Sequence, residues 1–218
     1  MYSTIPPATF WTDETIFDFV NSLKDSTILN LGSGAGLFDN KIQVPMINLD
    51  IVKHDSTDIV ADAHRLPFKS GSFDCIFSNA VLEHVKLPWE VAWEINRVLK
   101  PGGYIAINLP FLNTIHDEHD YFRFTLKGIR ELFPNYEELF GGVSSGGGSF
   151  LPLCKIQYIN LFVPFRFLRA LNYFIWGHLA FRLKVLDKLV AHKPDYVITA
   201  NSFYYIGQKT ENGSGTPK

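Results

Sequence analysis

A short apolar run that ends in three closely spaced glycines constrains the fold of this chain more than any other feature. Residues 27–31 (TILNL) are typical of a buried strand, and they lead directly into Gly32, Gly34 and Gly36. Glycine permits a tight turn and lets the backbone approach a ligand closely. In an open parallel sheet, ligands bind beyond the carboxyl ends of the strands, so this turn predicts an α/β domain with a candidate binding site. A tight strand-to-helix turn also requires glycine without any ligand, so the pattern needs a second feature to support it.

Asp50 supplies that second feature, because it ends the next expected strand 18 residues after Gly32. A carboxylate at roughly 20 residues from such a glycine accepts hydrogen bonds from a ribose diol, so the ligand is expected to contain adenosine. A nicotinamide dinucleotide is less favoured. The glycines are spaced Gly-x-Gly-x-Gly, and Asp39, Asn40 and Pro45 leave little room for a long helix that would bind a pyrophosphate.

Short apolar runs and amphipathic segments alternate along the rest of the chain. Further strands are expected at residues 44–49, 59–61, 73–77, 104–109 and 202–207. Helices are expected at residues 12–24, with Thr12 as the N-cap, and from Pro88 to Leu99. This alternation predicts an α/β fold with a doubly wound, mostly parallel sheet.

Residues 1–210 are expected to form one domain. A helical apolar and basic insertion would occupy about 155–193, before the last strand, and residues 211–218 would form a disordered tail. With 218 residues, 46% of them hydrophobic and 19% charged, a single globular core is expected.

Charge, termini and cysteines exclude several classes of protein. The net charge of −2 provides no basic surface for nucleic acid, so no nucleic-acid partner is expected. The first residues lack the basic and apolar stretches of a secretory signal, which predicts a cytoplasmic protein. Cys75 and Cys154 are too few for a disulfide framework or a cysteine zinc site.

Five motifs occur in an order that resembles the class I S-adenosylmethionine-dependent methyltransferases of the type 11 group, which includes the ubiquinone and menaquinone methylases. They are LNLGSGAG (29–36), NLDI (48–51), ADAHRLPFKSGSFDCIFSNAVLEHV (61–85), EINRVLKPGGYIAINLPF (94–111) and HDEHDYFRFT (116–125). The resemblance covers about half of the chain. It implies a Rossmann-like sheet of seven strands, S-adenosyl-L-methionine as cofactor, and methyl transfer to a small-molecule or lipid-like acceptor.

The resemblance also implies roles for residues near the glycine turn. Gly32, Ser33 and Gly34 would pass beneath the methionine part of the cofactor. Asp50 would hold the ribose hydroxyls, and Ile51 would lie against the adenine.

Four further residues are implied to surround the cofactor. Asp62 would accept the adenine amino hydrogens, the Ala63 backbone would donate to the ring, and Asn79 would approach the methionine amino group. Asn30 departs from the family, which often has Asp or Glu there, so the contact with the cofactor ammonium would be weaker or supplied by another residue. Asp50 and Asp62 also fit an ordinary role as turn residues at strand ends.

A cluster of titratable residues, His116, Asp117, His119 and Asp120, follows the fifth expected strand of the family fold. Imidazoles and carboxylates can bind a metal ion or move protons. These residues lie in one short segment without a distant third ligand, so no metal site is predicted. His116 or His119 is instead the candidate general base acting on the acceptor.

Four more candidate residues lie in the motifs at 61–85 and 116–125. Tyr121 and Arg123 are expected to contact the acceptor or to support the loop. Glu83 and His84 fall in a short expected helix, where a solvated acid and a half-buried histidine are expected rather than a catalytic pair.

Basic and aromatic residues are interleaved between Lys155 and His192. The longest uncharged stretch, residues 170–181, is shorter than the 18 or more residues of a spanning helix. Apolar residues form two adjacent stripes on a helix that opens near Pro164, a wider face than one contact with a sheet requires. Residues 161–190 are therefore expected to contact the acceptor, a second subunit or an anionic membrane surface, which would place the protein peripherally at the inner face of the membrane. A buried pair of lid helices also fits.

The sequence also fits two alternatives to a methyltransferase. The first is an NAD-dependent oxidoreductase, because the glycine turn and Asp50 suit any adenosine-containing cofactor. The second is a non-catalytic binding protein that retains the fold, which Asn30 and the basic apolar insertion would fit.

Overall fold

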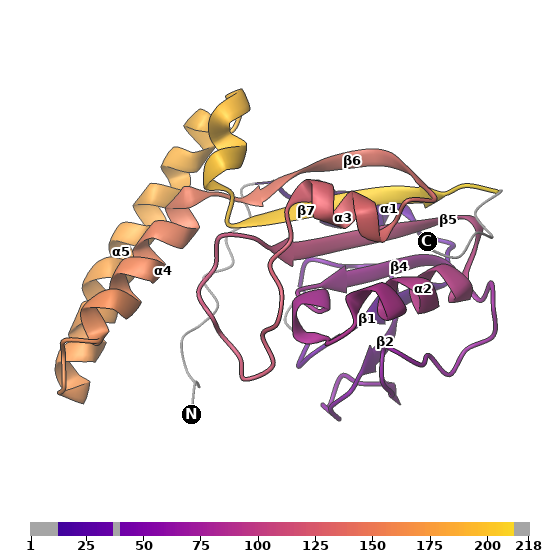
Figure 1. Ribbon diagram of the computed structural model, residues 1–218, viewed down its shortest axis with the longest axis horizontal. Helices are drawn as coiled ribbons and strands as arrows, with labels where there is room; N and C mark the ends of the chain where they lie inside the picture. Colours follow the sequence, from indigo (N-terminus) through magenta and orange to yellow (C-terminus); the bar gives the residue numbers. More distant parts are fainter. Residues whose placement is uncertain (1–12, 37–39, 212–218) are drawn as a thin grey trace.

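The computed structural model of the chain describes residues 13–36 and 40–211, except for the side chains of 178–182 and 184. A seven-stranded sheet lies at its centre, with the strand order β3-β2-β1-β4-β5-β7-β6 (Figure 1). The strands are β1 (Ile28–Leu31), β2 (Ile47–Asp50), β3 (Ile59–Val60), β4 (Phe73–Asn79), β5 (Leu99–Pro110), β6 (Tyr136–Ser145) and β7 (Ser202–Lys209). Strands β1 to β5 pair in parallel, and β7 runs antiparallel to both of its neighbours. The predicted mostly parallel sheet is confirmed.

Helices cover both faces of this sheet. They are α1 (Thr15–Ser22), the 3₁₀ turn η1 (Leu82–His84), α2 (Pro88–Val98), α3 (Leu126–Leu132), α4 (Gly147–Asn160), α5 (Arg166–Val190) and the 3₁₀ helix η2 (Pro194–Thr199). In Figure 1, α2 and α3 lie in front of the sheet and α1 lies behind it. The doubly wound arrangement is therefore confirmed, and so is a helical insertion before the last strand.

Strand β4 shows how one sequence serves two hydrophobic cores. Successive side chains of a strand point to opposite faces of the sheet. Ile76 packs with α2 and α3 in one core, whereas Cys75 and Phe77 pack with α1 in the other. This alternation explains why residues 73–77 are apolar at every position except Asp74, as expected for a strand buried on both faces.

Three elements, α3, β6 and η2, were not predicted from the sequence. Strand β6 pairs with β7 at the edge of the sheet, and most of its side chains from Glu137 to Gly141 are exposed. An edge strand with charged residues and glycines lacks the apolar alternation that predicts a strand. The predicted cap Thr12 lies outside the described residues, as does 212–218 of the expected tail.

The helical insertion begins at Gly147, earlier than the predicted position near 155. Residues 146–148 are all glycine, which in sequence indicates a loop. Here the lack of a side chain allows close helix packing instead. A Cβ on Gly148 would lie only 2.5 Å from the Leu183 carbonyl oxygen of α5.

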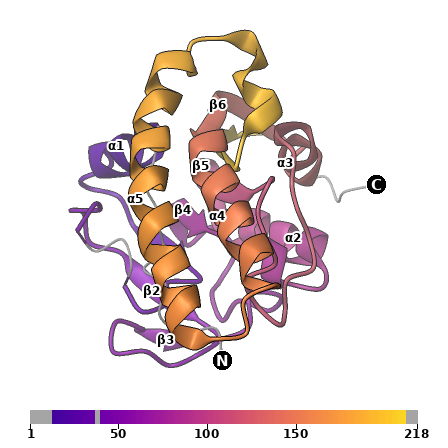
Figure 2. The same cartoon turned by 90° about the vertical axis from the view of Figure 1, so that its left-hand side faces the viewer.

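Helices α4 and α5 form an antiparallel hairpin, here called the helical arm (residues 147–190), that projects away from the sheet (Figures 1 and 2). Polar groups are buried between its two helices, together with the apolar Pro152 and Ile156. Asn172 donates from Nδ2 to Ile156 O (3.1 Å) and Asn160 Oδ1 (2.9 Å), and the buried carboxylate of Asp187 accepts from the Gly148 amide at 3.0 Å. No helix among the described residues is long and apolar enough to span a bilayer.

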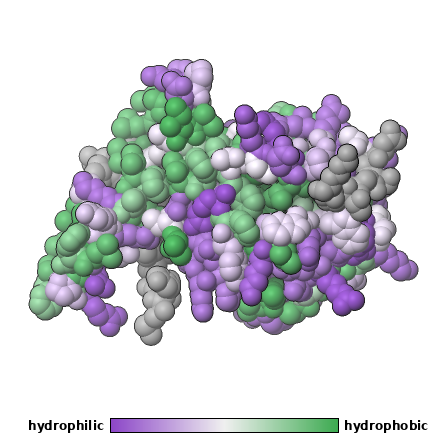
Figure 3. Space-filling view, viewed as in Figure 1, coloured by the Kyte–Doolittle hydropathy of each residue, from purple (hydrophilic) through white to green (hydrophobic). Residues whose placement is uncertain are grey.

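Large apolar side chains cover the outside of the helical arm, as the green surface in Figure 3 shows. The exposed large hydrophobic residues of the arm are Leu151, Tyr158, Leu161, Phe162, Phe165, Phe167, Leu168, Leu171, Phe174, Ile175, Val185, Leu186 and Leu189. A helix pair in water normally buries such residues between its helices. The arm therefore presents to solvent the kind of surface that marks an interaction site.

The two ends of the arm return to the same point of the sheet. Ser145, the last residue of β6, is the register partner of Ser202, the first residue of β7. Asn201 joins this point to the segment after β5, because its Nδ2 donates to Leu112 O (2.7 Å) and its carbonyl accepts from the Phe111 amide (2.8 Å). That segment leads to His116.

Candidate active site

The glycine turn after β1 has the geometry expected for close approach to a ligand. Gly32 and Gly34 have φ values of +72° and +56°, which other residues rarely adopt. A Cβ on Gly32 would lie 2.2 Å from Val81 Cγ2, whereas a Cβ on Gly34 would meet no atom of the described residues within 4 Å. Gly32 is thus required by the packing of the turn against Val81. Gly34 instead borders space that the described residues leave open, at the carboxyl end of the parallel strands.

Asp50 closes this turn from the end of β2. Its Oδ2 accepts a hydrogen bond from the Gly34 amide at 2.7 Å, and its Oδ1 accepts one from the Val52 amide at 2.9 Å. Each carboxylate oxygen has a further lone pair, so the fixed carboxylate can accept two more hydrogen bonds. The neighbouring Ile51 side chain is 67% exposed, which offers an apolar surface beside that acceptor pair.

Ser33 supplies a polar atom that lacks a partner. Its hydroxyl oxygen is buried and makes no hydrogen bond to any residue in the described part of the chain. Buried hydroxyls are usually paired, so an unpaired one at a candidate site indicates a place for a ligand atom or water. Together, the paired acceptor positions of Asp50, the exposed Ile51 and the Ser33 hydroxyl fit a ligand with a diol, an aromatic base and polar groups.

Asp62 and Ala63 lie just beyond the end of β3. The Asp62 Oδ1 atom accepts from the His64 amide at 2.9 Å and lies 2.7 Å from His64 Nδ1. These contacts, the His64 amide above all, lower the pKa of Asp62, so its carboxylate is ionised at neutral pH. Asp62 is exposed and can still accept hydrogen bonds, and Ala63 is half-buried beside it.

Two pairs of asparagines join the strand ends. The buried Asn30 donates from Nδ2 to Asn48 Oδ1 at 2.9 Å. Asn79 accepts at Oδ1 from Asn108 Nδ2 at 2.9 Å, which fixes the orientation of its amide. Ala80 follows in a left-handed conformation with φ of +56°, an uncommon conformation for alanine that marks a sharp turn at the end of β4.

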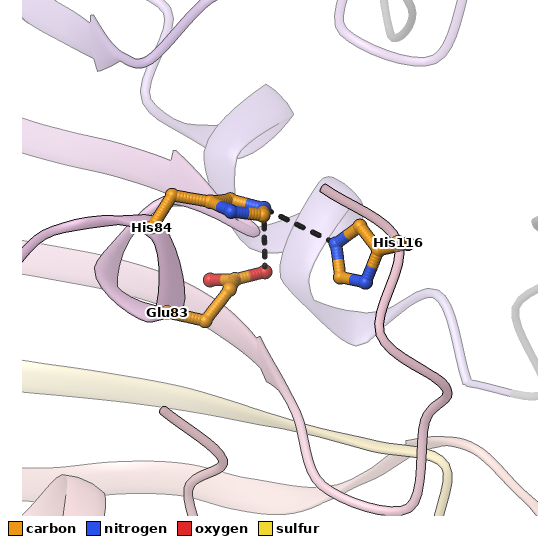
Figure 4. A group of neighbouring side chains, drawn as sticks. All are labelled: Glu83, His84 and His116. Atoms are coloured by element: carbon orange, nitrogen blue, oxygen red, sulfur yellow. Dashed lines mark hydrogen bonds and ion pairs between the residues drawn. The ribbon is translucent and has the colours of Figure 1, made fainter. Parts of the chain in front are cut away.

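A second group of side chains, Glu83, His84 and His116, meets where η1 faces the segment after β5 (Figure 4). We call it the Glu83 cluster. The Nε2 atoms of His84 and His116 lie 3.1 Å apart, and Glu83 Oε1 lies 3.7 Å from His84 Nε2. The prediction that Glu83 is solvated was wrong, because its side chain is 0% exposed and neither carboxylate oxygen has a hydrogen-bond partner among the described residues. Burial raises its pKa to about 8.

The loop after β5 holds the cluster in place through backbone and side-chain contacts. The amide of Tyr121 donates to Glu83 O at 2.8 Å, and His84 Nδ1 lies 2.9 Å from His119 O. On the other side, His116 Nδ1 lies 3.2 Å from Asp120 Oδ2. These contacts orient both imidazoles so that their Nε2 atoms face each other.

Asp120 is itself held by Arg123. Arg123 Nη2 donates to Asp120 Oδ2 at 2.6 Å, and Nη1 donates to Oδ1. The hydrogen bond from Arg123 lowers the pKa of Asp120 to about 2, so the carboxylate beside His116 is ionised at neutral pH. Further donors of Arg123 bind the carbonyls of Asn113, Thr114 and Phe122. The guanidinium thus ties the loop together.

His119 and Tyr121 lie apart from the Glu83 cluster. Their rings are stacked, with centroids 6.2 Å apart and an interplanar angle of 7°, and the Tyr121 hydroxyl lies 3.4 Å from His119 Nδ1. Both residues are exposed. Of the two histidines predicted as candidate bases, the structure brings His116, but not the His119 imidazole, into the cluster.

Sequence reasoning did not join His84 and Glu83 to His116, because 32 residues separate the two histidines. The order of the strands did, however, indicate that these two segments meet. The acid and histidine directly follow the fourth strand, and the His116 segment directly follows the fifth. Carboxyl ends of adjacent parallel strands meet at the same edge of a sheet, so segments that follow them become neighbours.

Comparison with known proteins agrees with this geometry. Residues 29–107, just over a third of the chain, match the family model described as a methyltransferase domain. An uncharacterized methyltransferase of Mycolicibacterium gilvum is 30% identical over 102 residues, which is 40% of each chain. The chain thus spans well under half the length of the curated relatives it matches.

Solved structures share the fold over most of the chain. The cyclase SpnF is 16% identical and covers 90% of this chain and 80% of its own, with a TM-score of 0.57. A phosphoethanolamine N-methyltransferase 2 from Haemonchus contortus, solved with S-adenosyl-L-methionine, is 18% identical and covers 90% of this chain and 51% of its own, with a TM-score of 0.54. At these identities the likeness concerns the fold.

The strand order, with its antiparallel seventh strand, and the site at the strand ends define a class I methyltransferase fold. The match of residues 29–107 to the methyltransferase-domain model agrees with the resemblance that the motifs indicate.

Proposed function

We propose that the protein transfers a methyl group from S-adenosylmethionine to an acceptor. The observation that carries the proposal is the fixed Asp50 carboxylate. Each of its two oxygens can accept one more hydrogen bond, and the exposed Ile51 and Gly34 lie beside it. The family match and the relatives named methyltransferases support the same activity. When bound, the cofactor would supply an activated methyl group on a sulfonium.

The chain's own residues would bind and orient that cofactor. Asp50 would accept the ribose hydroxyls, with Ile51 against the adenine and Asp62 and Ala63 at its edge. The turn at Gly34 and the Ser33 hydroxyl would lie along the methionine part. Such positioning is the main source of rate in a displacement that needs only correct alignment of its reactants.

Asp50→Ala is expected to weaken S-adenosylmethionine binding by about one to two orders of magnitude, because charge-assisted hydrogen bonds to the ribose contribute about 1.5–3 kcal/mol. Isothermal titration calorimetry measures the change. Asp25→Ala removes an exposed carboxylate elsewhere and is the matched control, expected to leave affinity unchanged. Equal affinity of Asp50→Ala and the parent, in proteins with the same melting temperature, would contradict the assignment.

An NAD-dependent oxidoreductase fits this turn less well. A pyrophosphate would require a helix N-terminus directly after the glycines, and the described residues 32–36 and 40–46 form turns and bends without a helix. NAD is therefore expected not to displace S-adenosylhomocysteine in a competition titration.

A non-catalytic role is the second alternative, since the cyclase SpnF shows that this fold is not confined to proteins named methyltransferases.

We further propose that the acceptor lies at the Glu83 cluster. Val81, which contacts Gly32, is two residues from Glu83 in sequence, so the cluster adjoins the glycine turn. An oxygen or carbon acceptor must lose its proton, and His116 would act on that proton, with Asp120 orienting its ring. Tyr121 is exposed on the same loop and would contact the acceptor, whereas Arg123 would keep the loop in shape.

The helical arm, we propose, docks on an anionic membrane surface, from which a lipid-like acceptor would come. Exposed basic residues accompany its apolar surface: Lys155, Arg166, Arg169 and Lys188. Lys155 Nζ lies 3.7 Å from the centroid of the Trp176 ring. Apolar side chains beside cations are the pattern of interfacial helices, in which burial and attraction to headgroups add together.

Neutralising Arg166, Arg169, Arg182 and Lys184 is expected to abolish binding to phosphatidylserine vesicles, because each charge near the surface contributes about 1 kcal/mol and the four together about 4 kcal/mol. The side chains of Arg182 and Lys184 lie outside the described residues. Vesicle co-sedimentation at low and high salt measures the effect. The matched control neutralises the exposed Lys24, Lys69, Lys86 and Lys127, which removes the same charge from other surfaces. Absence of vesicle binding by the folded parent would contradict the membrane proposal.

A further inference from the structure

We propose that Glu83, His84 and His116 form a binding site for a divalent transition metal ion of the zinc class. Their ligand atoms, Glu83 Oε1, His84 Nε2 and His116 Nε2, all lie within 4.8 Å of one another and come from two distant segments of the chain. Two imidazoles and one carboxylate are the protein ligands of one common catalytic zinc site, which leaves a fourth position open.

The hydrogen bonds of the two histidines leave electron pairs facing each other. His84 Nδ1 lies 2.9 Å from His119 O, and His116 Nδ1 lies 3.2 Å from Thr114 O. Carbonyl oxygens only accept, so each Nδ1 carries a hydrogen. In an imidazole whose only ring hydrogen is on Nδ1, the Nε2 atom presents a lone pair, and the two Nε2 atoms lie 3.1 Å apart. Two such lone pairs repel at this distance, so a proton or a metal ion is expected between them.

Two of the three separations between the ligand atoms are close to those around a metal ion. Zinc–nitrogen bonds of about 2.0–2.1 Å in a tetrahedral arrangement place two ligand atoms about 3.3–3.4 Å apart. The observed separations of 3.1 Å for His84 Nε2–His116 Nε2 and 3.7 Å for His84 Nε2–Glu83 Oε1 lie on either side of this value. The third pair, His116 Nε2 and Glu83 Oε1, lies within 4.8 Å, so metal binding would draw these two side chains closer together.

Glu83 gives an independent reason to expect a cation. Its side chain is fully buried, and neither carboxylate oxygen has a hydrogen-bond partner among the described residues. A buried carboxylate without partners is costly, and a bound cation would remove that cost. Protonation would also neutralise Glu83, so the experiment below has to separate a proton from a metal ion.

Groups around the cluster match those that accompany metal-binding histidines. A ligating histidine usually donates its other ring nitrogen to a carboxylate or a backbone carbonyl, which fixes the ring and increases its basicity. His116 Nδ1 has Asp120 Oδ2 and Thr114 O at 3.2 Å, and His84 Nδ1 has His119 O at 2.9 Å. Arg123 in turn holds Asp120.

The position of the site gives the ion a role at the acceptor. An ion at the Glu83 cluster would bind an oxygen of the acceptor at its fourth coordination position. His84 and His116 would then be metal ligands, and His116 would not act as a general base. That role rests on the proposed function, whereas metal binding itself does not.

The test is titration of the full chain, freed of metal by chelation, with Zn²⁺ by calorimetry and with Co²⁺ by visible absorption. We expect one tight site per chain and the intense visible bands of Co²⁺ in a site of low coordination number. His84→Ala and His116→Ala are each expected to remove these bands. Asp120→Asn keeps the ligands but changes their outer partner, so a loss of about 10–100-fold in affinity is expected.

His119→Ala is the matched control, because it removes a histidine of the same loop whose imidazole is outside the cluster and retains the carbonyl that His84 contacts. Its affinity for Co²⁺ is expected to equal that of the parent. Should the His84 or His116 variants fail to fold, broadening of the two histidines' ring signals by Co²⁺ in the parent provides the same information. Failure of the folded parent to bind Zn²⁺ or Co²⁺ would overturn the proposal, as would unchanged binding by the folded His84→Ala and His116→Ala variants.

Discussion

His116→Ala is expected to lower the turnover of a proton-losing acceptor by about two to four orders of magnitude, whether His116 acts as a base or as a metal ligand. Affinity for S-adenosylmethionine should stay unchanged, because His116 lies in the cluster and Asp50 at the glycine turn. The measurements are single-turnover release of S-adenosylhomocysteine with an acceptor found by screening, and calorimetry for the cofactor. Turnover at the parental rate would remove His116 from the proposed mechanism.

Chelation distinguishes the two roles of His116. If His116 is a base, the parent treated with a chelator keeps its turnover. If His116 is a metal ligand, the treated parent loses turnover and Zn²⁺ restores it, and His116→Ala is insensitive to added metal. Cofactor binding measured in the same samples shows whether the methyltransferase proposal stands independently of the metal site.

Gly32→Ala is expected to destabilise the protein by about 2–5 kcal/mol, since a left-handed alanine costs about 1–2 kcal/mol and overpacking about 1–3 kcal/mol. The new Cβ would lie 2.2 Å from Val81 Cγ2. Gly34→Ala has the same backbone constraint without the clash, so a loss of only about 1–2 kcal/mol is expected. Urea unfolding of the two variants measures the difference.

A second substitution isolates the contact between Gly32 and Val81. Removing the Val81 methyl groups relieves the clash, so Gly32→Ala with Val81→Ala should lose less stability than the two single variants combined. Additive losses would show that the turn has rearranged. Gly34→Ala is also expected to reduce cofactor affinity, because its methyl group would enter the space beside Asp50; unchanged affinity would contradict the cofactor placement.

The fold could be predicted from the sequence mainly where both faces of the sheet are buried. Residues 27–31 and 73–77 are mostly apolar runs, and both predicted strands lie close to the observed β1 and β4. Strand β6 was missed because it lies at the edge of the sheet and carries mostly exposed residues. Its position follows from pairing with β7, a contact between segments separated by the whole helical arm.

The residues of the candidate site could likewise be predicted from the sequence only in part. Gly32, Gly34 and Asp50 could be identified because their roles depend on local backbone geometry and on a fixed spacing along the chain. The Glu83 cluster could not, since its members meet only through the packing of η1 against the loop after β5. The burial of Glu83 is likewise a property of that packing, and adjacent sequence gives no sign of it.

The pairing of Ser145 with Ser202 means that the helical arm interrupts what would otherwise be an ordinary β-hairpin. A turn of a few residues would bridge the two strand ends, because antiparallel neighbours can be joined by two to five residues. The arm can therefore be excised or exchanged for another without cutting any strand of the sheet. It can also open and close as a cooperative unit of its own, with an opening free energy below that of global unfolding. Amide hydrogens within α4 and α5 would then exchange with solvent while those of β4 and β5 remain protected.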